Sequence, residues 1–189
     1  YLMLTDDPKS LALCQQQFEL GENMTDVFSA LAALVNSEQP GAAAAREEAL
    51  REFYQRWQHE SLVVNQWLVV QASSPVAGDL ASIKTLRESP AFDIKNPNKV
   101  RSLIGVFSNQ NLVHFHAPNG SGYQFLADQV LLLNRQNPQI AARLLTPLTK
   151  WRRYDAVRQE LMRAELQRIA AENKLSKDVF EVVNKSLVE

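Results

Sequence analysis

The sequence predicts an all-helical protein, a right-handed superhelix of antiparallel helix pairs of the HEAT or armadillo type. Apolar residues recur at helical spacing along most of the chain. Three Asx-Pro dipeptides, Asp7-Pro8, Asn96-Pro97 and Asn137-Pro138, are typical of helix starts, because the Asx side chain accepts an orphan N–H and proline has none to lose. Apart from residues 61–70, no segment clearly alternates between apolar and polar residues with hairpin turns on either side. A β-sheet would therefore lack partner strands.

These signals place helices near residues 8–20, 25–36, 42–58, 61–72, 76–88, 97–107, 120–135, 138–148, 151–172 and 176–187. Short joints with Gly, Pro, Asn or Ser separate them. The second helix is expected to start after Asn23 or Thr25 and to bury Val27, Leu31 and Leu34.

The third and fourth helices carry the most distinctive side-chain patterns. The third helix begins with four alanines and carries Phe53 and Trp57, which lie four residues apart on one face. Residues 61–70 are apolar nearly all round, which predicts a central position with neighbours on several sides. The β-branched residues of this segment would also suit a strand.

A weak internal repeat supports the helical-pair architecture. The two Asn-Pro dipeptides lie about 40 residues apart, a spacing typical of HEAT and armadillo repeats. Each is followed closely by an arginine, Arg101 and Arg143. A stack of such pairs buries its core between neighbours and leaves one face free for a partner.

Composition narrows the class of protein. The chain has 189 residues, which suits a single helical domain over 1–189, and 46% of them are hydrophobic. The net charge of −1 gives no global field toward nucleic acid or anionic lipid, and no apolar run reaches the roughly 20 residues of a membrane span. Cys14 is the only cysteine, so an intramolecular disulfide is impossible. We therefore expect neither a nucleic-acid nor a membrane partner.

The first residues suggest a chain cut within a helix. Tyr1-Leu2-Met3-Leu4 is apolar, lacks an initiator methionine, and is too short and uncharged for a secretory signal. We expect a fragment of a longer protein.

Two histidine motifs raise the question of a metal site. His59-Glu60 begins like the H-E-x-x-H zinc motif, but the position of the second histidine is Val63, so a helix terminus is the better interpretation. His114-Phe115-His116 would point two imidazoles the same way in an extended segment, although a stable site needs a third or fourth ligand. No Cys, Asp or Glu lies nearby before Asp128, so we expect a polar loop with Phe115 packed inward.

Two further segments are weak candidates for anion or nucleic-acid binding. Residues 119–122 (Asn-Gly-Ser-Gly) form a glycine-rich turn before a helix, but the lysine of a P-loop is missing. Residues 151–154 (Trp-Arg-Arg-Tyr) are expected to begin a long helix. Its later arginines form no stripe and are compensated by i,i+3 partners, Glu160 with Arg163 and Glu165 with Arg168, and its apolar side is expected to comprise Tyr154, Val157, Leu161, Ala164 and Ile169.

Four stretches resemble the C-terminal part of the bacterial aminopeptidase N (alanyl aminopeptidase) family. They are residues 96–107 (NPNKVRSLIGVF), 120–128 (GSGYQFLAD), 137–143 (NPQIAAR) running on to 151–154 (WRRY), and the tail 175–187. The resemblance covers roughly the whole chain and is strongest after Ala91.

The resemblance implies a helical superhelix that closes over a thermolysin-like catalytic domain in a cytoplasmic zinc enzyme. Zinc and the general base would lie in that catalytic domain, so this chain is expected to hold no metal and no catalytic residue. Arg101, Gln139 and Arg143 match family positions that line the pocket for residues following the scissile bond. Both arginines would alternatively make structural pairs between repeats.

The implied partners are the other domains of the same chain and a peptide substrate, in a monomer. The alternative function is an autonomous helical-repeat scaffold that binds a protein on its concave face. A scaffold would show polar capping helices at both ends, whereas a docked domain would expose an apolar or charged patch.

Overall fold

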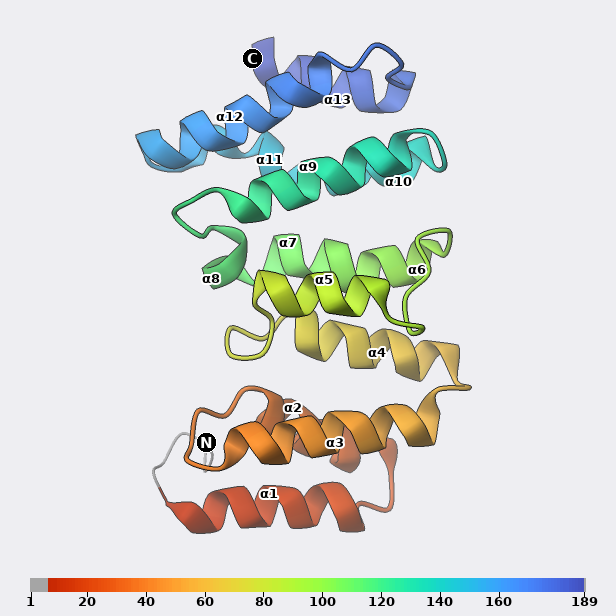
Figure 1. The fold of residues 1–189 in the computed structure, drawn as a ribbon, viewed down its shortest axis with the longest axis vertical. Coiled ribbons are helices and arrows are strands. Elements are labelled where there is room, and N and C mark those ends of the chain that lie inside the picture. The colour runs from red at the N-terminus through yellow and green to blue at the C-terminus, as the bar shows by residue number, and fades with distance from the viewer. Residues whose placement is uncertain (1–6, 189) are drawn as a thin grey trace.

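The computed structural model describes residues 7–188, which form a stack of helices (Figure 1). The α-helices of the first half are α1 (Pro8–Leu20), α2 (Met24–Val35), α3 (Ala42–Trp57), α4 (Ser61–Ala72), α5 (Leu80–Glu88), α6 (Pro97–Val100) and α7 (Val106–Gln110). Those of the second half are α8 (Leu112–Phe115), α9 (Ser121–Asn134), α10 (Pro138–Leu144), α11 (Thr146–Thr149), α12 (Ala156–Ala170) and α13 (Lys177–Val188). The described residues contain no strand, and the all-helical prediction is confirmed.

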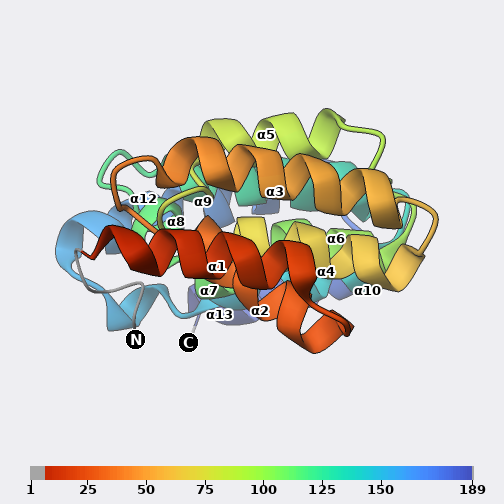
Figure 2. The ribbon, with the colours of Figure 1, turned by 90° about the horizontal axis from the view of Figure 1, so that it is seen from below.

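The helices form successive pairs that stack from α1 at one end to α12 and α13 at the other (Figure 1). Seen along the stack, α3 and α5 lie on one side, and α2, α7 and α13 lie on the opposite side (Figure 2). The second helices of the first four pairs are α2, α4, the α6–α7 segment and α10, and we call these four the second layer.

The predicted proline-marked helix starts are confirmed. The side-chain oxygens of Asp7, Asn96 and Asn137 each accept a hydrogen bond from a backbone N–H two or three residues further on. These bonds satisfy amides that a helix start otherwise leaves unpaired.

The core runs continuously between the layers. The predicted contributions of Val27, Leu31 and Leu34 from α2 are confirmed. Helix α4 is a helix rather than a strand, and it is central as expected, since it packs against α2, α3, α6 and α7. Near the middle of the stack, the Phe107 ring meets those of Phe115 and Phe125 edge-on, with centroids 6.0 Å and 5.8 Å apart.

Helix α5 starts later than the sequence predicted. The expected helix near 76–88 begins at Leu80, with Asp79 as its N-cap. The Ser74 hydroxyl accepts hydrogen bonds from the backbone N–H groups of Val76 and Ala77, which holds residues 74–77 in a turn. Serine and aspartate compete with the helix for these amides, so the helix can begin only after them.

The predicted helix near 97–107 extends to Gln110 and contains a π-helical turn over Arg101–Gly105 (η2). The Val106 N–H donates to the carbonyl of Arg101, five residues earlier. A π-turn accommodates one extra residue within a helix and is frequent at functional sites.

The long helix predicted over 151–172 was wrong at its beginning. Trp151–Arg153 form a 3-10 turn, Tyr154 is extended at φ −105° and ψ 173°, and α12 starts at Ala156. The cause is Asp155, whose carboxylate accepts from the Arg158 N–H and caps a new helix.

The prediction of which α12 residues face the core was also partly wrong. Val157 is 61% exposed, and the buried residues are Met162, Leu166 and Ile169. Met162, Leu166 and Ile169 follow the i, i+4, i+7 spacing of a single helix face, which is the face that meets the core. Of the predicted charge pairs, Glu165 with Arg168 is present at 2.7 Å, whereas the described residues show no ion pair between Glu160 and Arg163.

No helix among the described residues is long and apolar enough to cross a bilayer. The expectation that Tyr1 lies within a cut helix falls on residues 1–6, outside the described part of the chain.

Candidate functional site

The three predicted substrate-contacting residues all lie in the second layer. Arg101 begins the π-turn, and Gln139 and Arg143 lie on α10. All three side chains are exposed. Two adjacent pairs of the stack therefore supply the candidate site.

Arg101 and Arg143 both line one hollow of about 370 Å³ between the α6–α7 segment and α10. The hollow is lined by Arg101, Gly105, Val106, Asn109, Gln110, Ile140, Arg143 and Leu144. We call it the arginine hollow. Gln139 does not line it, although its neighbour Ile140 does.

The arginine hollow is cationic. Two guanidinium groups line it, and no Asp or Glu does. A guanidinium presents several N–H donors in a planar fork that matches a carboxylate or a row of carbonyl oxygens. The hollow therefore suits an anionic or carbonyl-rich ligand such as the end of a peptide.

The predicted alternative, in which the arginines pair with acids between repeats, can be compared with the contacts. Arg101 donates to the Asn98 side-chain oxygen, which lies on the same helical segment, at 2.5 Å. Among residues 7–188, neither Arg101 nor Arg143 forms an ion pair with a carboxylate. Both guanidiniums keep donors for another partner.

The π-turn shapes this hollow. Because the turn contains an extra residue, Arg101 and Gly105 are placed differently from the positions they would take in a regular helix. A Cβ built on Gly105 would lie 3.8 Å from Leu144 Cδ2 and 3.9 Å from Arg101 Cβ, so glycine leaves space between the two walls.

A second, larger hollow of about 700 Å³ adjoins the first. It lies between α2, α4 and the start of the α6–α7 segment, and Arg101 lines it too. Its lining includes the apolar residues Met24, Phe28, Leu62 and Val63. We call it the apolar hollow, and together the two hollows follow the second layer over several helices.

The two histidines at 114 and 116 do not act as a pair. Residues 112–115 are helical, so the side chains do not point the same way as in the extended segment expected. His114 Nε2 lies 2.9 Å from the Pro75 carbonyl oxygen, and His116 Nδ1 lies 2.8 Å from the Tyr123 hydroxyl. Phe115 is fully buried between them, as predicted. Within residues 7–188, no three His, Cys, Asp or Glu side chains gather as metal ligands.

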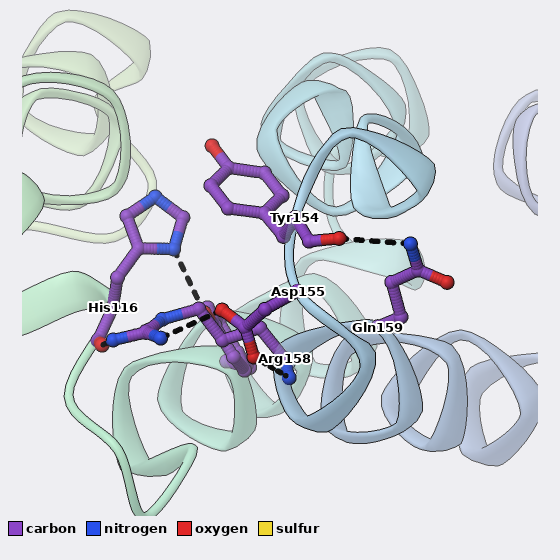
Figure 3. Close-up of polar contacts among 6 residues, drawn as sticks. His116, Tyr154, Asp155, Arg158 and Gln159 are labelled. Carbon is purple, nitrogen blue, oxygen red and sulfur yellow. Dashed lines mark hydrogen bonds and ion pairs between the residues drawn. The ribbon is translucent and has the colours of Figure 1, made fainter.

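His116 instead belongs to a polar cluster that joins α8, α9 and α12 (Figure 3). Arg158 donates to the His116 carbonyl oxygen and pairs with Asp155 at 2.7 Å. The Tyr154 ring lies over the imidazole, with centroids 4.5 Å apart. Burial lowers the pKa of His116, and the charge of Arg158 lowers it further. Burial also raises the pKa of Tyr123 to about 12. Neutral forms of both rings are thus favoured.

The remaining motifs have structural roles. His59 lies in the turn after α3, and Glu60 precedes α4 as its N-cap residue. Gly120 has a positive φ of 71° and leads into α9, which confirms the turn predicted there.

Comparison with known proteins shows which family the chain belongs to. The family described as "Domain of unknown function (DUF3458_C) ARM repeats" matches residues 1–188. The chain belongs to this family. The predicted armadillo-like architecture is thereby confirmed.

Individual relatives of this DUF3458_C domain confirm the resemblance to the C-terminal part of bacterial aminopeptidase N. The chain is 43% identical to aminopeptidase N of Haemophilus influenzae and 41% identical to that of Escherichia coli, over 93% of its own length and 20% of theirs. It is similar in structure to Legionella pneumophila aminopeptidase A, solved in complex with aspartic acid, with a TM-score of 0.85, 36% identity, and coverage of 95% of this chain and 21% of that one. The domain thus spans about a fifth of the length of the relatives it matches.

Sequence reasoning missed the apolar hollow of this DUF3458_C domain. Its walls come from three helices separated along the chain, and periodicity describes only one helix at a time. One local signal was present, since Asn65 and Gln66 interrupt an otherwise apolar helix and both line the hollow.

Proposed function

We propose that this chain is the C-terminal helical domain of a zinc aminopeptidase that removes N-terminal amino acids from peptides. The domain closes over the catalytic part, shapes the substrate chamber and restricts entry to short, flexible peptides. It contributes no catalytic residue. The relatives named aminopeptidase N and aminopeptidase A, of which the chain matches about a fifth, support this function over an autonomous scaffold.

The arginine hollow is the observation that carries the proposal. Arg101 and Arg143 come from adjacent pairs of the stack, line one hollow and have no carboxylate partner among residues 7–188. They would hold carbonyl oxygens or the terminal carboxylate of residues that follow the scissile bond. Gln139, exposed on α10 next to the hollow, would add an amide.

The zinc ion would be held by the part of the enzyme outside this chain. The one sequence similar to a zinc motif here has Val63 in place of the second histidine. The chain's partners would be the other domains of the same polypeptide and the peptide. The cytoplasmic location and monomeric state implied by the family resemblance belong to the same proposal.

Apolar residues exposed on the outer helices support docking onto the rest of an enzyme. Leu13 and Leu20 on α1 are 54% and 67% exposed, and Phe180 and Val188 on α13 are 54% and 78% exposed. These apolar residues stand among exposed polar ones on both helices, and docking would remove their side chains from water.

The test is Arg143→Ala in the complete enzyme. We expect kcat/KM for alanyl tri- and tetrapeptides to fall about tenfold, the size of effect of losing one charge-assisted contact. A single-residue chromogenic amide, which does not reach the hollow, should be cleaved at nearly the original rate. Arg153→Ala is the matched control, because Arg153 is exposed and lies outside the hollow. Wild-type turnover of tetrapeptides by Arg143→Ala would refute the assignment.

A further inference from the structure

The apolar hollow shares a lining residue with the arginine hollow but has different chemistry. Arg101 lines both. We propose that the apolar hollow is a second subsite for the same peptide, which receives a large uncharged side chain adjacent to the part held by Arg101 and Arg143. This inference rests on the proposed function, and it adds a preference among peptides that the arginines alone do not give.

Its walls keep apolar area in water. Leu62 on α4 is 76% exposed, and Met24 on α2 is 36% exposed, with Phe28 and Val63 beside them. Covering such side chains is favourable by roughly 25 cal/mol per Å² of apolar surface removed from water. Methionine and leucine are adaptable in shape, so the hollow fits large aliphatic and aromatic side chains rather than one of them.

The charge of the lining indicates which side chains would be rejected. Among residues 7–188, no Asp, Glu or Lys lines the apolar hollow, and the only ionised group there is Arg101, which also lines the arginine hollow. A lysine side chain would bring its ammonium close to a guanidinium, with no carboxylate in the lining to compensate it. Neutral side chains avoid that cost.

The hollow also offers a polar anchor for a peptide backbone. Asn65 is 8% exposed, lines the hollow, and has a buried Oδ1 with no hydrogen-bond partner among the described residues. An unpaired buried acceptor costs free energy unless a donor reaches it. Because this oxygen is itself buried, a peptide N–H would reach it only if the Asn65 side chain turned toward the hollow. The lining thus combines the apolar Met24, Phe28, Leu62 and Val63 with polar residues that include Asn65 and Gln66, and ligand sites usually combine apolar surface with placed polar groups.

The position of Arg101 argues for a peptide as the occupant. A peptide whose carbonyl or carboxylate groups meet Arg101 and Arg143 has to run along the second layer. A neighbouring side chain then lies over Met24, Phe28 and Leu62.

The experiment measures kcat/KM of the complete enzyme for two tetrapeptide series, Ala-Ala-Xaa-Ala and Ala-Ala-Ala-Xaa, with Xaa as Ala, Leu, Phe or Lys. In wild type we expect Leu and Phe to exceed Ala about tenfold and Lys by more, at one of the two positions, because added apolar groups in a pocket discriminate by about that factor. Met24→Ser with Leu62→Ser should reduce the Leu-over-Ala ratio to near one. Leu62→Asp should invert the order of Leu and Lys.

Leu112→Ser is the matched control, since Leu112 is 60% exposed on α8 and lies outside both hollows. It should leave every ratio unchanged. Thermal unfolding of each variant verifies folding, and because Leu62 is exposed, Leu62→Asp should fold normally.

The outcomes separate the two claims. If Arg143→Ala slows all tetrapeptides but the Leu62 variants leave the ratios unchanged, the subsite is wrong and the proposed function stands. If the Leu62 variants slow all peptides equally, another part of the enzyme covers the hollow and the subsite is again wrong. If neither the arginine nor the Leu62 variants change any tetrapeptide rate, the proposed function itself fails.

Discussion

Asn111 connects segments that are far apart in the sequence. It is 1% exposed, and its Nδ2 lies 3.1, 2.9 and 2.8 Å from the carbonyl oxygens of Ala72, Ser74 and Gly78. Its Oδ1 accepts from the His114 N–H. One amide thus fixes the loop between α4 and α5 against the start of α8.

We predict that Asn111→Ala lowers the free energy of unfolding by about 2 kcal/mol or more, because several buried carbonyls lose their donor. Urea denaturation followed by circular dichroism measures this. Asn109→Ala is the control, because Asn109 is exposed and bonds only locally, so its effect should stay below about 0.5 kcal/mol. Equal losses in both variants would show that the Asn111 contacts are unimportant.

His116 predicts a dependence of stability on pH. Burial and Arg158 lower its pKa in the folded chain, so the unfolded chain binds this proton more readily. The folded state should be unaffected by this group above about pH 6.5, the ordinary histidine pKa, and should lose stability as the pH falls below it.

Thermal unfolding at pH 7.5 and pH 5 tests this assignment. His116→Gln should show a smaller decrease between these pH values than the wild-type chain. His59→Gln, at an exposed turn residue, should retain the wild-type decrease. An unchanged decrease in His116→Gln would mean that other groups cause the pH dependence.

At the scale of the elements, two helical glycines differ in what surrounds them. A Cβ on Gly122 in α9 would come within 2.3 Å of the Phe115 carbonyl oxygen, whereas a Cβ on Gly105 in the π-turn meets only ordinary contacts at 3.8 Å and beyond. Helix α9 therefore depends on glycine to approach α8, while the π-turn does not.

We predict that Gly122→Ala destabilises the chain by about 2 kcal/mol, since overpacked sites typically cost 1–3 kcal/mol. Gly105→Ala should be neutral or stabilising by up to about 1 kcal/mol, because alanine is the better helix former. The urea concentrations at the unfolding midpoints of the two variants are compared with that of the wild-type chain. Equal stability of the two variants would contradict the close approach at Gly122.

Local signals accounted for most helix boundaries and failed where polar side chains compete for the same amides. Asn96 and Asn137 could be identified as caps because each precedes a proline. The turn held by Ser74 and the new helix start at Asp155 were missed, since serine and aspartate also occur inside helices. The π-turn at Arg101 leaves no pattern in hydrophobic spacing.

The candidate site was predictable only in part. Resemblance to aminopeptidase N pointed to Arg101 and Arg143, and the structure brings them to one hollow. Their shared location depends on the packing of α10 beside the α6–α7 segment, which is a contact between distant parts of the chain. The apolar hollow depends on three helices and could not be deduced from any one of them.

At the scale of the whole molecule, the stack presents its two hollows along one layer, and some of its exposed apolar residues lie on the outer helices α1 and α13. This division suits a domain that docks through its outer helices and leaves the second layer open to a peptide. The proposed role requires both surfaces, because a domain that bound peptides without docking would not control access to a catalytic site.

The central claim is tested most directly by reconstitution. This chain is mixed with the separately expressed remainder of the aminopeptidase, and hydrolysis of an alanyl chromogenic substrate and of a tetrapeptide is measured alongside association. The proposal predicts a complex in which tetrapeptide kcat/KM rises at least about tenfold and Arg143→Ala abolishes most of that rise. No association, together with identical rates with and without the chain, would contradict it.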